Sequence, residues 1–348
     1  MPAISIDTFF ACTLMITVIV AAMAMTAKII QPYIDSIENL NQTDYLKELA
    51  DQILLSTGEP QNWGSNRTLM PEIFGLAKNN SLVPYELDVD KVCRLNPENA
   101  YHISYPSLLE SLKIKNVALR ISITQIIDIS ITPIANQSSD SLTNYTFQIK
   151  VKEEGLPVSA SLHCYMLAKN FLSGVYTNTN QNGEATVSFA IPNDSNGTAL
   201  LVAFARNSQD ERIAGYATYS FGHLSESPPP NRSFVELSPL DYRLYVNKLY
   251  DDATLLEAYA LTYSYNKTLT LSNNSAYDIP EFLDKSPMIL VVTGTNSSDY
   301  FVEWTAYPQI PLEMGANMQG LESSSFLYIV SINEVLYKVR IQCEGPSG

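Results

Sequence analysis

Few side chains in this sequence stand in a spacing that supports catalysis. The three histidines, His102, His163 and His223, are far apart, and none belongs to an H-E-x-x-H zinc motif. The sequence also lacks G-x-S-x-G, a P-loop and G-x-G-x-x-G, the patterns of common hydrolases and nucleotide-binding proteins. His163 lies on the polar face of an alternating segment, where a solvated side chain is expected. The sequence therefore predicts a protein that is not an enzyme.

Two pairs of nearby carboxylates are the candidate metal ligands. They are Asp88 with Asp90 and Asp251 with Asp252, and neither pair has the twelve-residue loop pattern of a calcium site. Acidic residues are also favourable at helix N-termini, where they face the positive end of the helix dipole. We therefore expect solvated acids, no metal and no cofactor.

The four cysteines predict different environments. Cys12 lies in an apolar run and is expected to act as a small hydrophobic residue. Cys164 lies on the inward face of a predicted strand, which indicates a buried thiol. Cys93 and Cys343 could form a disulfide that joins the first part of the chain to its last strand, as extracellular conditions permit. Sequence does not give connectivity, so this pairing stays open.

The recurring motif is N-x-[ST], the acceptor for N-linked glycans. The 26 asparagines would give about four such motifs by chance, and the sequence has eleven. Turns are rich in Asn, Ser and Thr in any case, which raises the chance number. We favour heavy N-glycosylation, with acceptors at Asn41, Asn66, Asn79, Asn136, Asn144, Asn193, Asn196, Asn231, Asn266, Asn273 and Asn296.

Composition limits the class of protein that carries these residues. The chain has 348 residues, a formal net charge of −15 and a pI near 4.6, so no nucleic-acid partner is expected, because no basic patch can displace phosphate counterions. With 46% hydrophobic and 16% charged residues, the chain is too apolar for a disordered protein. Its length predicts two or three domains.

One segment is apolar enough to cross a membrane. Residues Phe9 to Ala27 include no charge, and a helix of that length spans about 28 Å. A cleaved signal peptide is the alternative, but its apolar region would be shorter and preceded by basic residues, whereas the charge before Lys28 is Asp7. A retained apolar helix is therefore expected.

The helical pattern continues beyond this segment. Pro32 predicts a kink, and the polar residues from Asn39 to Thr43 predict an interruption. Gly58 and Pro60 predict the helix end. An apolar stripe one turn apart marks the amphipathic second part, at Leu46, Leu49, Ala50, Ile53 and Leu54.

This order of segments, followed by Ser56-Thr57-Gly58-Glu59-Pro60-Gln61-Asn62-Trp63-Gly64, resembles archaeal type IV pilin-like proteins, in which T-x-G-x-P-x-x-W often follows the helix. The stretch Leu87-Asp88-Val89-Asp90-Lys91-Val92-Cys93-Arg94-Leu95 is similar to a recurring feature of that family. The resemblance covers about residues 1–130. It implies a class III signal peptide cut by a prepilin peptidase and a helix that packs in a filament core. Position 5 is Ser5, where bacterial pilins have Glu.

Beyond the helix, the period of the apolar residues changes to two, which predicts strands. Short helices at 71–78, 88–95 and 107–113 precede a strand over 117–131, and 133–143 reads as a linker. Strands then recur every 8–12 residues, which is typical of an immunoglobulin-like sandwich. We predict an α+β protein with an N-terminal hydrophobic helix and a mainly β head, divided into 1–58 (the helix), 59–135 (connecting helices and first strands), 140–224 (an Ig-like sandwich) and 233–348 (a C-terminal β domain).

The leading hypothesis for function is structural. The chain would be a subunit of an extracellular cell-surface filament, a helical homopolymer of its own copies that passes through the membrane before assembly and displays glycosylated β-domains, with adhesion to an unknown ligand as a further role. The alternative is a monomeric surface protein or minor pilin anchored by the same helix and acting as a binding module. The residues expected to drive assembly are Phe9, Phe10, Leu14, Ile16, Val18, Ile19, Val20 and Met23.

Glycosylation is directly testable by mass. We expect the intact protein from its native source to weigh more than the 38.6 kDa of the bare chain and to lose the excess on chemical deglycosylation. A native mass equal to that of the chain would contradict glycosylation at all eleven acceptors.

Overall fold

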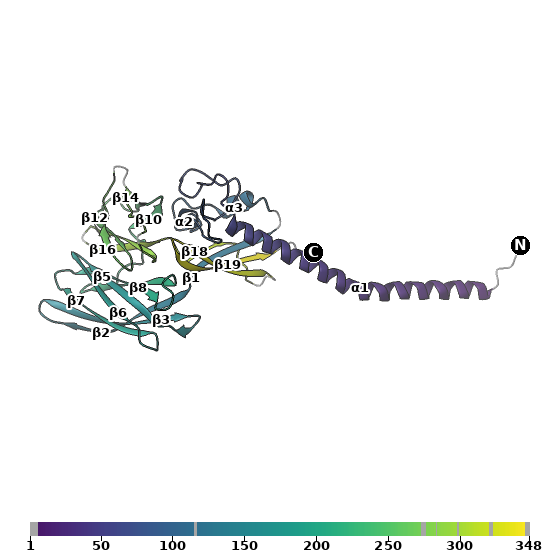
Figure 1. Cartoon of the computed structure of the whole chain (residues 1–348), viewed down its shortest axis with the longest axis horizontal. Coiled ribbons are helices and arrows are strands. Elements are labelled where there is room, and N and C mark those ends of the chain that lie inside the picture. The colour runs from purple at the N-terminus through teal and green to yellow at the C-terminus, as the bar shows by residue number, and fades with distance from the viewer. Residues whose placement is uncertain are drawn as a thin grey trace. The chain divides into compact units, whose positions relative to one another are not determined.

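The computed structural model describes residues 6–114, 117–272, 276–282, 284–297, 299–319 and 323–344, without the side chains of residues 6–8, 29–30 and 32–42. The chain divides into two compact units, residues 1–51 and residues 52–346. The first is helical and the second is mainly β (Figure 1), so the predicted α+β class is confirmed.

A single long helix, α1 (Ile6–Leu55), contains the apolar segment. It runs through Pro32 and through residues 39–43, so the predicted interruption is wrong. Polar residues inside a helix cost less than about 0.7 kcal/mol each, which neighbouring helix formers offset. Among the described residues, one stretch is long and apolar enough to cross a membrane, Phe9–Lys28.

The second unit begins with loops and two short helices, α2 (Val89–Cys93) and α3 (Tyr105–Leu112). The Asp88 side chain caps α2 by accepting from the backbone N–H groups of Asp90 and Lys91, both at 3.0 Å. The helix predicted over 71–78 is wrong. The N–H groups of Glu72 and Ile73 bond instead to the carbonyl of Glu59, which holds this segment extended.

The first sheet joins distant parts of the sequence. Its strands, in the order β17-β1-β19-β18, are antiparallel. Leu119 pairs with Cys343 and Ile123 with Val339, so residues 59–135 have no sheet of their own and the predicted domain boundaries do not follow the sheets. The strands are β17 (Leu312–Gly315), β1 (Ala118–Gln125), β19 (Val335–Glu344) and β18 (Ser324–Ile332).

A two-sheet sandwich forms the middle of the second unit. One sheet has the order β2-β3-β7, with β4 also on β3, and the other has the order β6-β5-β8-β9. The strands are β2 (Ile127–Ser138), β3 (Leu142–Glu153), β4 (Leu156–Pro157), β5 (Ala160–Ala168), β6 (Phe171–Asn178), β7 (Glu184–Pro192), β8 (Gly197–Asn207) and β9 (Ala214–His223). The linker predicted over 133–143 is wrong, because most of it forms the paired ends of β2 and β3.

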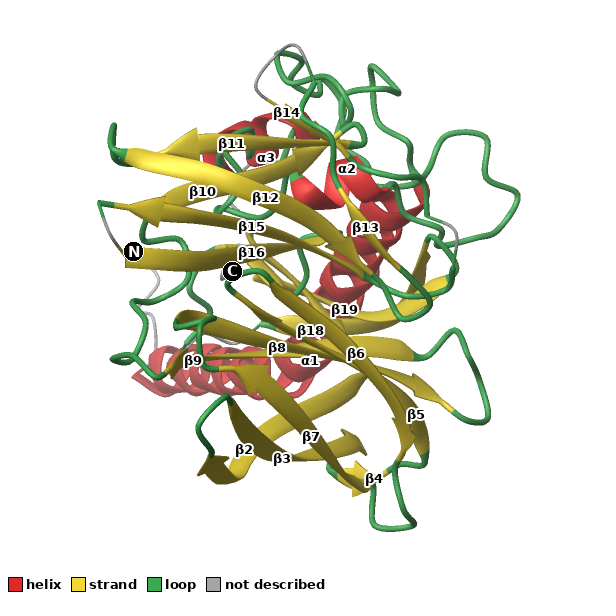
Figure 2. Ribbon diagram, turned by 90° about the vertical axis from the view of Figure 1, so that its left-hand side faces the viewer, coloured by secondary structure: helices red, strands yellow, loops and turns green. Residues whose placement is uncertain are grey.

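Two further sheets follow, of which the one with β12, β15 and β16 packs on the sandwich and the smaller one adjoins it through β10 and β16. One has the order β13-β12-β15-β16 and the other β10-β11-β14. Figure 2 shows β5 and β8 between the sheet of β2, β3 and β7 and the sheet of β12, β15 and β16. The strands are β10 (Val235–Leu240), β11 (Arg243–Lys248), β12 (Ala253–Leu261), β13 (Asn266–Thr268), β14 (Ala276–Asp278), β15 (Met288–Asn296) and β16 (Asp299–Tyr307).

The core therefore lies on both faces of β5 and β8. Alternate residues such as Cys164 and Leu201 face the sandwich interior, while Tyr165 and Val202 face β15 and β16. Burial on both faces removes the usual alternation between apolar and polar positions. It also buries His163, the histidine of β5.

Candidate functional site

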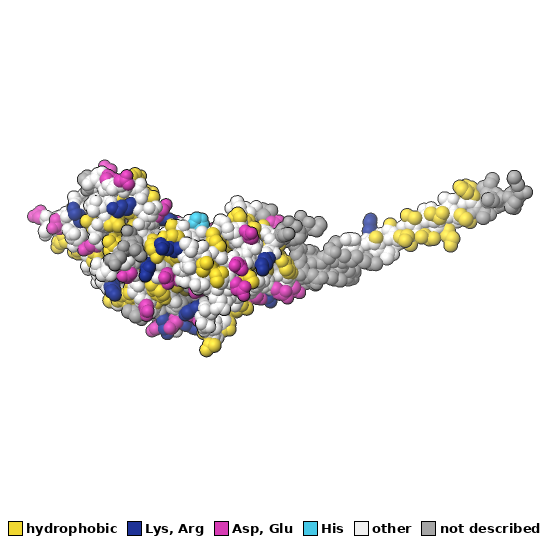
Figure 3. All heavy atoms as spheres, turned by 90° about the horizontal axis from the view of Figure 1, so that it is seen from above, with side chains coloured by type: hydrophobic (Ala, Val, Ile, Leu, Met, Phe, Trp, Pro, Cys, Tyr) yellow, Lys and Arg dark blue, Asp and Glu magenta, His cyan; other side chains and the backbone are white. Residues whose placement is uncertain are grey.

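The apolar half of α1, Phe9 to Ala27, is an extended exposed hydrophobic surface. All eight residues predicted to drive assembly are exposed, from 49% for Ile19 to 70% for Leu14. Figure 3 shows hydrophobic side chains covering this segment, with Lys28 as the nearest charge along the sequence. Soluble proteins rarely leave a continuous apolar surface of this size in water, so this surface is suited to lipid or to another protein chain.

Even the polar side chains of the segment are internally satisfied. The hydroxyls of Thr13, Thr17 and Thr26 donate to the carbonyls of Phe9, Thr13 and Ala22, each over 2.8 Å. A hydroxyl bonded within its own helix needs no water partner. The segment therefore carries little polar penalty on transfer to a dry environment.

The loop that follows the helix packs around Trp63. The indole is fully buried, and its Nε1 donates to the carbonyl of Gly75 over 3.2 Å. Gly58 has φ +70°, and a Cβ at this position would lie 2.6 Å from the carbonyl oxygen of Ile73. Packing therefore explains the glycine and the tryptophan of the T-x-G-x-P-x-x-W pattern, Gly58 and Trp63.

Two buried cations connect this loop to α2. The ammonium of Lys91 donates to the carbonyls of Thr57 at 2.9 Å and Ala77 at 2.8 Å. Burial lowers the pKa of Lys91. The guanidinium of Arg94 lies over the Trp63 ring and donates to the carbonyls of Tyr101, Trp63, Asn66 and Leu69. The two segments that resemble pilin-like proteins are therefore one packed unit. No pattern in the sequence predicted a role for Lys91 or Arg94.

The two carboxylate pairs differ in their exposure to solvent. Asp251 and Asp252 are exposed, as predicted. Asp90 is not a solvated acid, since only 6% of it is exposed, and one of its oxygens accepts from the Tyr307 hydroxyl at 2.8 Å and the backbone N–H of Asp241 at 2.9 Å. Burial raises the pKa of Asp90 to about 6. The segment 238–241 and β16 cover α2 here, a contact that local sequence does not reveal.

The disulfide that the sequence left open between Cys93 and Cys343 is not formed. Both thiols are free and buried, and Cys93 Sγ accepts from the backbone N–H of Gln309 at 3.4 Å. Cys343 lies on β19, beside Leu119 of β1, so the connection between the two regions is made by strand pairing. Cys164 is a buried thiol, as predicted, and Cys12 is exposed on the apolar helix.

The histidines are placed by packing. His163 was expected in solvent but is buried, because Tyr176 of β6 and Tyr263, which follows β12, cover it. Its Nδ1 lies 2.6 Å from the Tyr263 carbonyl, and its ring stacks on Tyr176. Desolvation lowers its pKa. His223 is also buried and bonds through Nδ1 to the Tyr145 hydroxyl at 3.0 Å. His102 is exposed.

The glycan acceptors fall into two groups, apart from Asn41 and Asn273, which lie outside the described side chains. Some acceptors already use their carboxamides: Asn231 bonds to both backbone groups of Trp304, and Asn193 bonds to Ser139 and Thr143. The Asn296 carboxamide faces Asp252. The acceptors with exposed side chains are Asn66, Asn79, Asn136, Asn144, Asn196 and Asn266.

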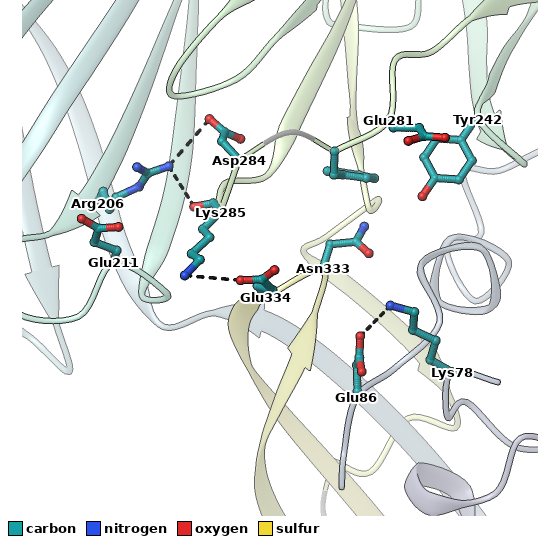
Figure 4. Close-up of a pocket in the computed structure, with 11 residues that line it drawn as sticks. Lys78, Glu86, Arg206, Glu211, Tyr242, Glu281, Asp284, Lys285, Asn333 and Glu334 are labelled. Atoms are coloured by element: carbon teal, nitrogen blue, oxygen red, sulfur yellow. Dashed lines mark hydrogen bonds and ion pairs between the residues drawn. The ribbon is translucent and has the colours of Figure 1, made fainter. Parts of the chain in front are cut away.

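A polar cavity of about 510 Å³ lies where the β18–β19 turn, the end of β8 and residues 284–285 meet (Figure 4). Three ion pairs cross its walls: Lys78 with Glu86, Arg206 with Asp284 and Lys285 with Glu334. The described residues that line it include no Ser, Thr, Cys or His. Across the described part of the chain, no group of three or more His, Cys, Asp or Glu side chains is arranged to hold a metal ion. The cavity is therefore a junction braced by ion pairs.

Comparisons with known proteins give no family. No protein-family model matches the chain, and no curated protein does. The solved structure of HBP35 of Porphyromonas gingivalis is 13% identical over 52% of this chain and 63% of its own, with a TM-score of 0.20. Human GIVD cytosolic phospholipase A2 is 10% identical over 68% of this chain and 34% of its own, with a TM-score of 0.15. The chain spans less than two thirds of either protein, and similarities this weak support no conclusion.

The Trp63 loop can be tested with a pair of glycine variants. Gly58 and Gly155 both have φ near +75°, but a Cβ on Gly155 would meet no atom within 4 Å. We expect Gly155→Ala to lower the free energy of unfolding by about 1–2 kcal/mol and Gly58→Ala to cost about 1–3 kcal/mol more, because it also clashes with backbone. Urea unfolding of the detergent-solubilised full chain measures both. Equal losses would mean that Gly58 is not tightly packed.

Asp90 predicts a pH dependence of stability. The folded state holds the Asp90 proton with a pKa of about 6, above the ordinary 3.8, so the stability from the protonated carboxyl is complete below pH 4 and is lost as the pH rises through 6. Asp90→Asn keeps an oxygen for the two hydrogen bonds and has no charge to bury. We expect this variant to gain about 3 kcal/mol over the wild type between pH 4 and pH 7.

The exposed Asp252→Asn is the matched control for this titration and should show no such gain. Urea unfolding of all three proteins at four pH values measures the effect. A difference between Asp90→Asn and the wild type that is independent of pH would contradict the assignment.

Proposed function

We propose that this chain is the structural subunit of an extracellular type IV pilus-like filament, in which the apolar half of α1 packs against copies of itself. The observation that carries the proposal is the exposed, charge-free surface from Phe9 to Ala27 on a chain whose remainder forms buried cores of its own. The proposal assigns the chain no catalytic activity and places it at the cell surface, in the membrane before assembly.

The free energy of covering this segment favours assembly. Burial of apolar surface contributes about 25 cal/mol per Å², and each large side chain such as Phe9, Leu14 or Ile16 exposes more than half of its area. Several such side chains together exceed the 4–15 kcal/mol or so that association costs in lost freedom of motion. Copies of the same helix provide a partner with matching chemistry.

The head of this subunit would be displayed outside the core. The strand order β2-β3-β7 facing β6-β5-β8-β9 supports an immunoglobulin-like sandwich, a fold that hosts many functions. Exposed acceptors on several strands and loops support a glycosylated outer surface. Adhesion through this surface is part of the proposal, with the ligand unassigned.

A second candidate is a monomeric surface protein held in the bilayer by the same helix. The length of the apolar stretch favours it, because twenty residues, Phe9–Lys28, extend about 30 Å and match the hydrocarbon thickness of a membrane. The two candidates differ in whether protein or lipid surrounds the mature helix.

One substitution tests the role of the apolar surface. Val18→Asp places a carboxylate in the middle of the segment, where burial costs about 3 kcal/mol or more. We expect it to abolish filaments in electron micrographs while circular dichroism shows a folded β head. Leu82→Asp is the matched control, since Leu82 lies in a loop, is 98% exposed and should tolerate the charge. Normal filaments from Val18→Asp would exclude a helix-packed core.

The native thiol Cys12 separates the two candidates in the same preparation. The other three cysteines are buried within the fold, and Cys12 lies on the apolar surface that either candidate covers, so a membrane-permeable bismaleimide is used to reach it. In a filament we expect ladders of cross-linked subunits, because the helices lie side by side. A monomeric anchor would give single chains.

A further inference from the structure

An aromatic groove opens on one side of the β-sandwich. Tyr145 and Phe147 of β3 and Tyr219 and Phe221 of β9 form its floor, with the rings of Tyr145 and Phe221 4.8 Å apart and those of Phe147 and Tyr219 5.9 Å apart. The groove has a volume of about 410 Å³, which is in the range of small-molecule sites. Tyr219 and Phe221 are only partly buried, so the floor is accessible.

The strand β2 forms one wall of this groove. Its inward-facing residues become steadily more exposed along the strand, from buried Ile127 to the exposed Pro133 and Asn136. A β-bulge between Pro133 and Ala135 adds Ile134, which is 56% exposed and lines the groove. The inner face of the sandwich is therefore open at this end, and apolar surface reaches solvent.

One glycan acceptor points into this opening. Asn136 pairs with Tyr145 across the strands, so the two side chains lie on the same face with their Cβ atoms about 5 Å apart. Asn136 lines the groove, and among the described residues its carboxamide has no hydrogen-bond partner. Ser138, the third residue of the acceptor motif, is on the same face and bonds to Thr143 at 3.1 Å.

We infer that the glycan on Asn136 folds back into this groove and covers the aromatic floor, so that its first sugars act as part of the sandwich. The inference rests on the glycosylation proposed above and adds a structural role for one acceptor. The faces of aromatic rings carry partial negative charge, and the C–H groups on one side of a pyranose ring carry partial positive charge. A sugar stacked on Tyr219 and Phe221 would cover the surface that Ile134 and Pro133 also border.

The covalent step is the ordinary one for this modification. Asn136 Nδ2 forms a bond to C1 of the first sugar, and the bond between C1 and the phosphate of an activated lipid-linked donor breaks. The phosphate leaves with the electron pair, and one amide proton passes to a base of the transferase. The remaining N–H stays with the glycosylated side chain.

A neighbouring acceptor provides the matched control. Asn144 lies on β3, is exposed and alternates with the buried Thr143 and Tyr145, so its side chain faces away from the groove. Asn136→Gln and Asn144→Gln each remove one acceptor by the same change, and Ser138→Ala removes the Asn136 motif while keeping the asparagine. Glycopeptide mass spectrometry of the native-source protein gives the occupancy of each site.

We expect Asn136→Gln and Ser138→Ala to lower the melting temperature of the full chain by about 2–4 °C and to speed amide exchange over residues 132–138. Asn144→Gln should change neither. In a Phe221→Leu background the loss caused by Asn136→Gln should shrink, because the stacking surface is reduced.

Three outcomes would overturn the inference: an unoccupied Asn136, equal effects of Asn136→Gln and Asn144→Gln, or an Asn136→Gln effect that Phe221→Leu does not change. Filament formation and occupancy at the other acceptors are measured on the same samples. A negative result here with intact filaments would leave the proposed function standing.

Discussion

The constraint on which the rest of this molecule depends is that the apolar half of α1 cannot remain in water. From Phe9 to Ala27 the chain has no charge, and its threonine hydroxyls are bonded to its own carbonyls. A segment of this kind gains nothing from solvent and loses little by leaving it. The remainder of the chain has to bury its own apolar residues. It achieves this with several sheets whose cores are filled locally.

The loops after the helix need hydrogen-bond partners for their backbone carbonyls. Residues 57–70 have little regular structure, so their carbonyls lack the partners that a helix or sheet would provide. Lys91 and Arg94 supply donors to four of these carbonyls and to two more outside this range, those of Ala77 and Tyr101. Burying two cations is costly, but each is hydrogen-bonded to backbone rather than left unpaired. The result is a loop held as firmly as a regular element.

Some of this could be read from the sequence and some could not. The apolar helix and the change to a period of two beyond it are local patterns with strong periods, and both were predicted correctly. His163 and Asp90 were assigned to solvent because their local pattern is polar. Both are covered by segments a hundred or more residues away, which contain Tyr263 and Asp241. The hairpin that joins β2 and β3 was taken for a linker because its residues are polar, although their backbones are paired and their side chains line an open groove.

The position of β19 has a consequence for the order of events during synthesis. This strand lies between β1 and β18, so the first sheet lacks its centre until residues 335–344 have been made. The apolar helix is complete nearly three hundred residues earlier. Pairings between strands so far apart in sequence form slowly. The apolar segment is therefore synthesised long before the first sheet can close around its central strand.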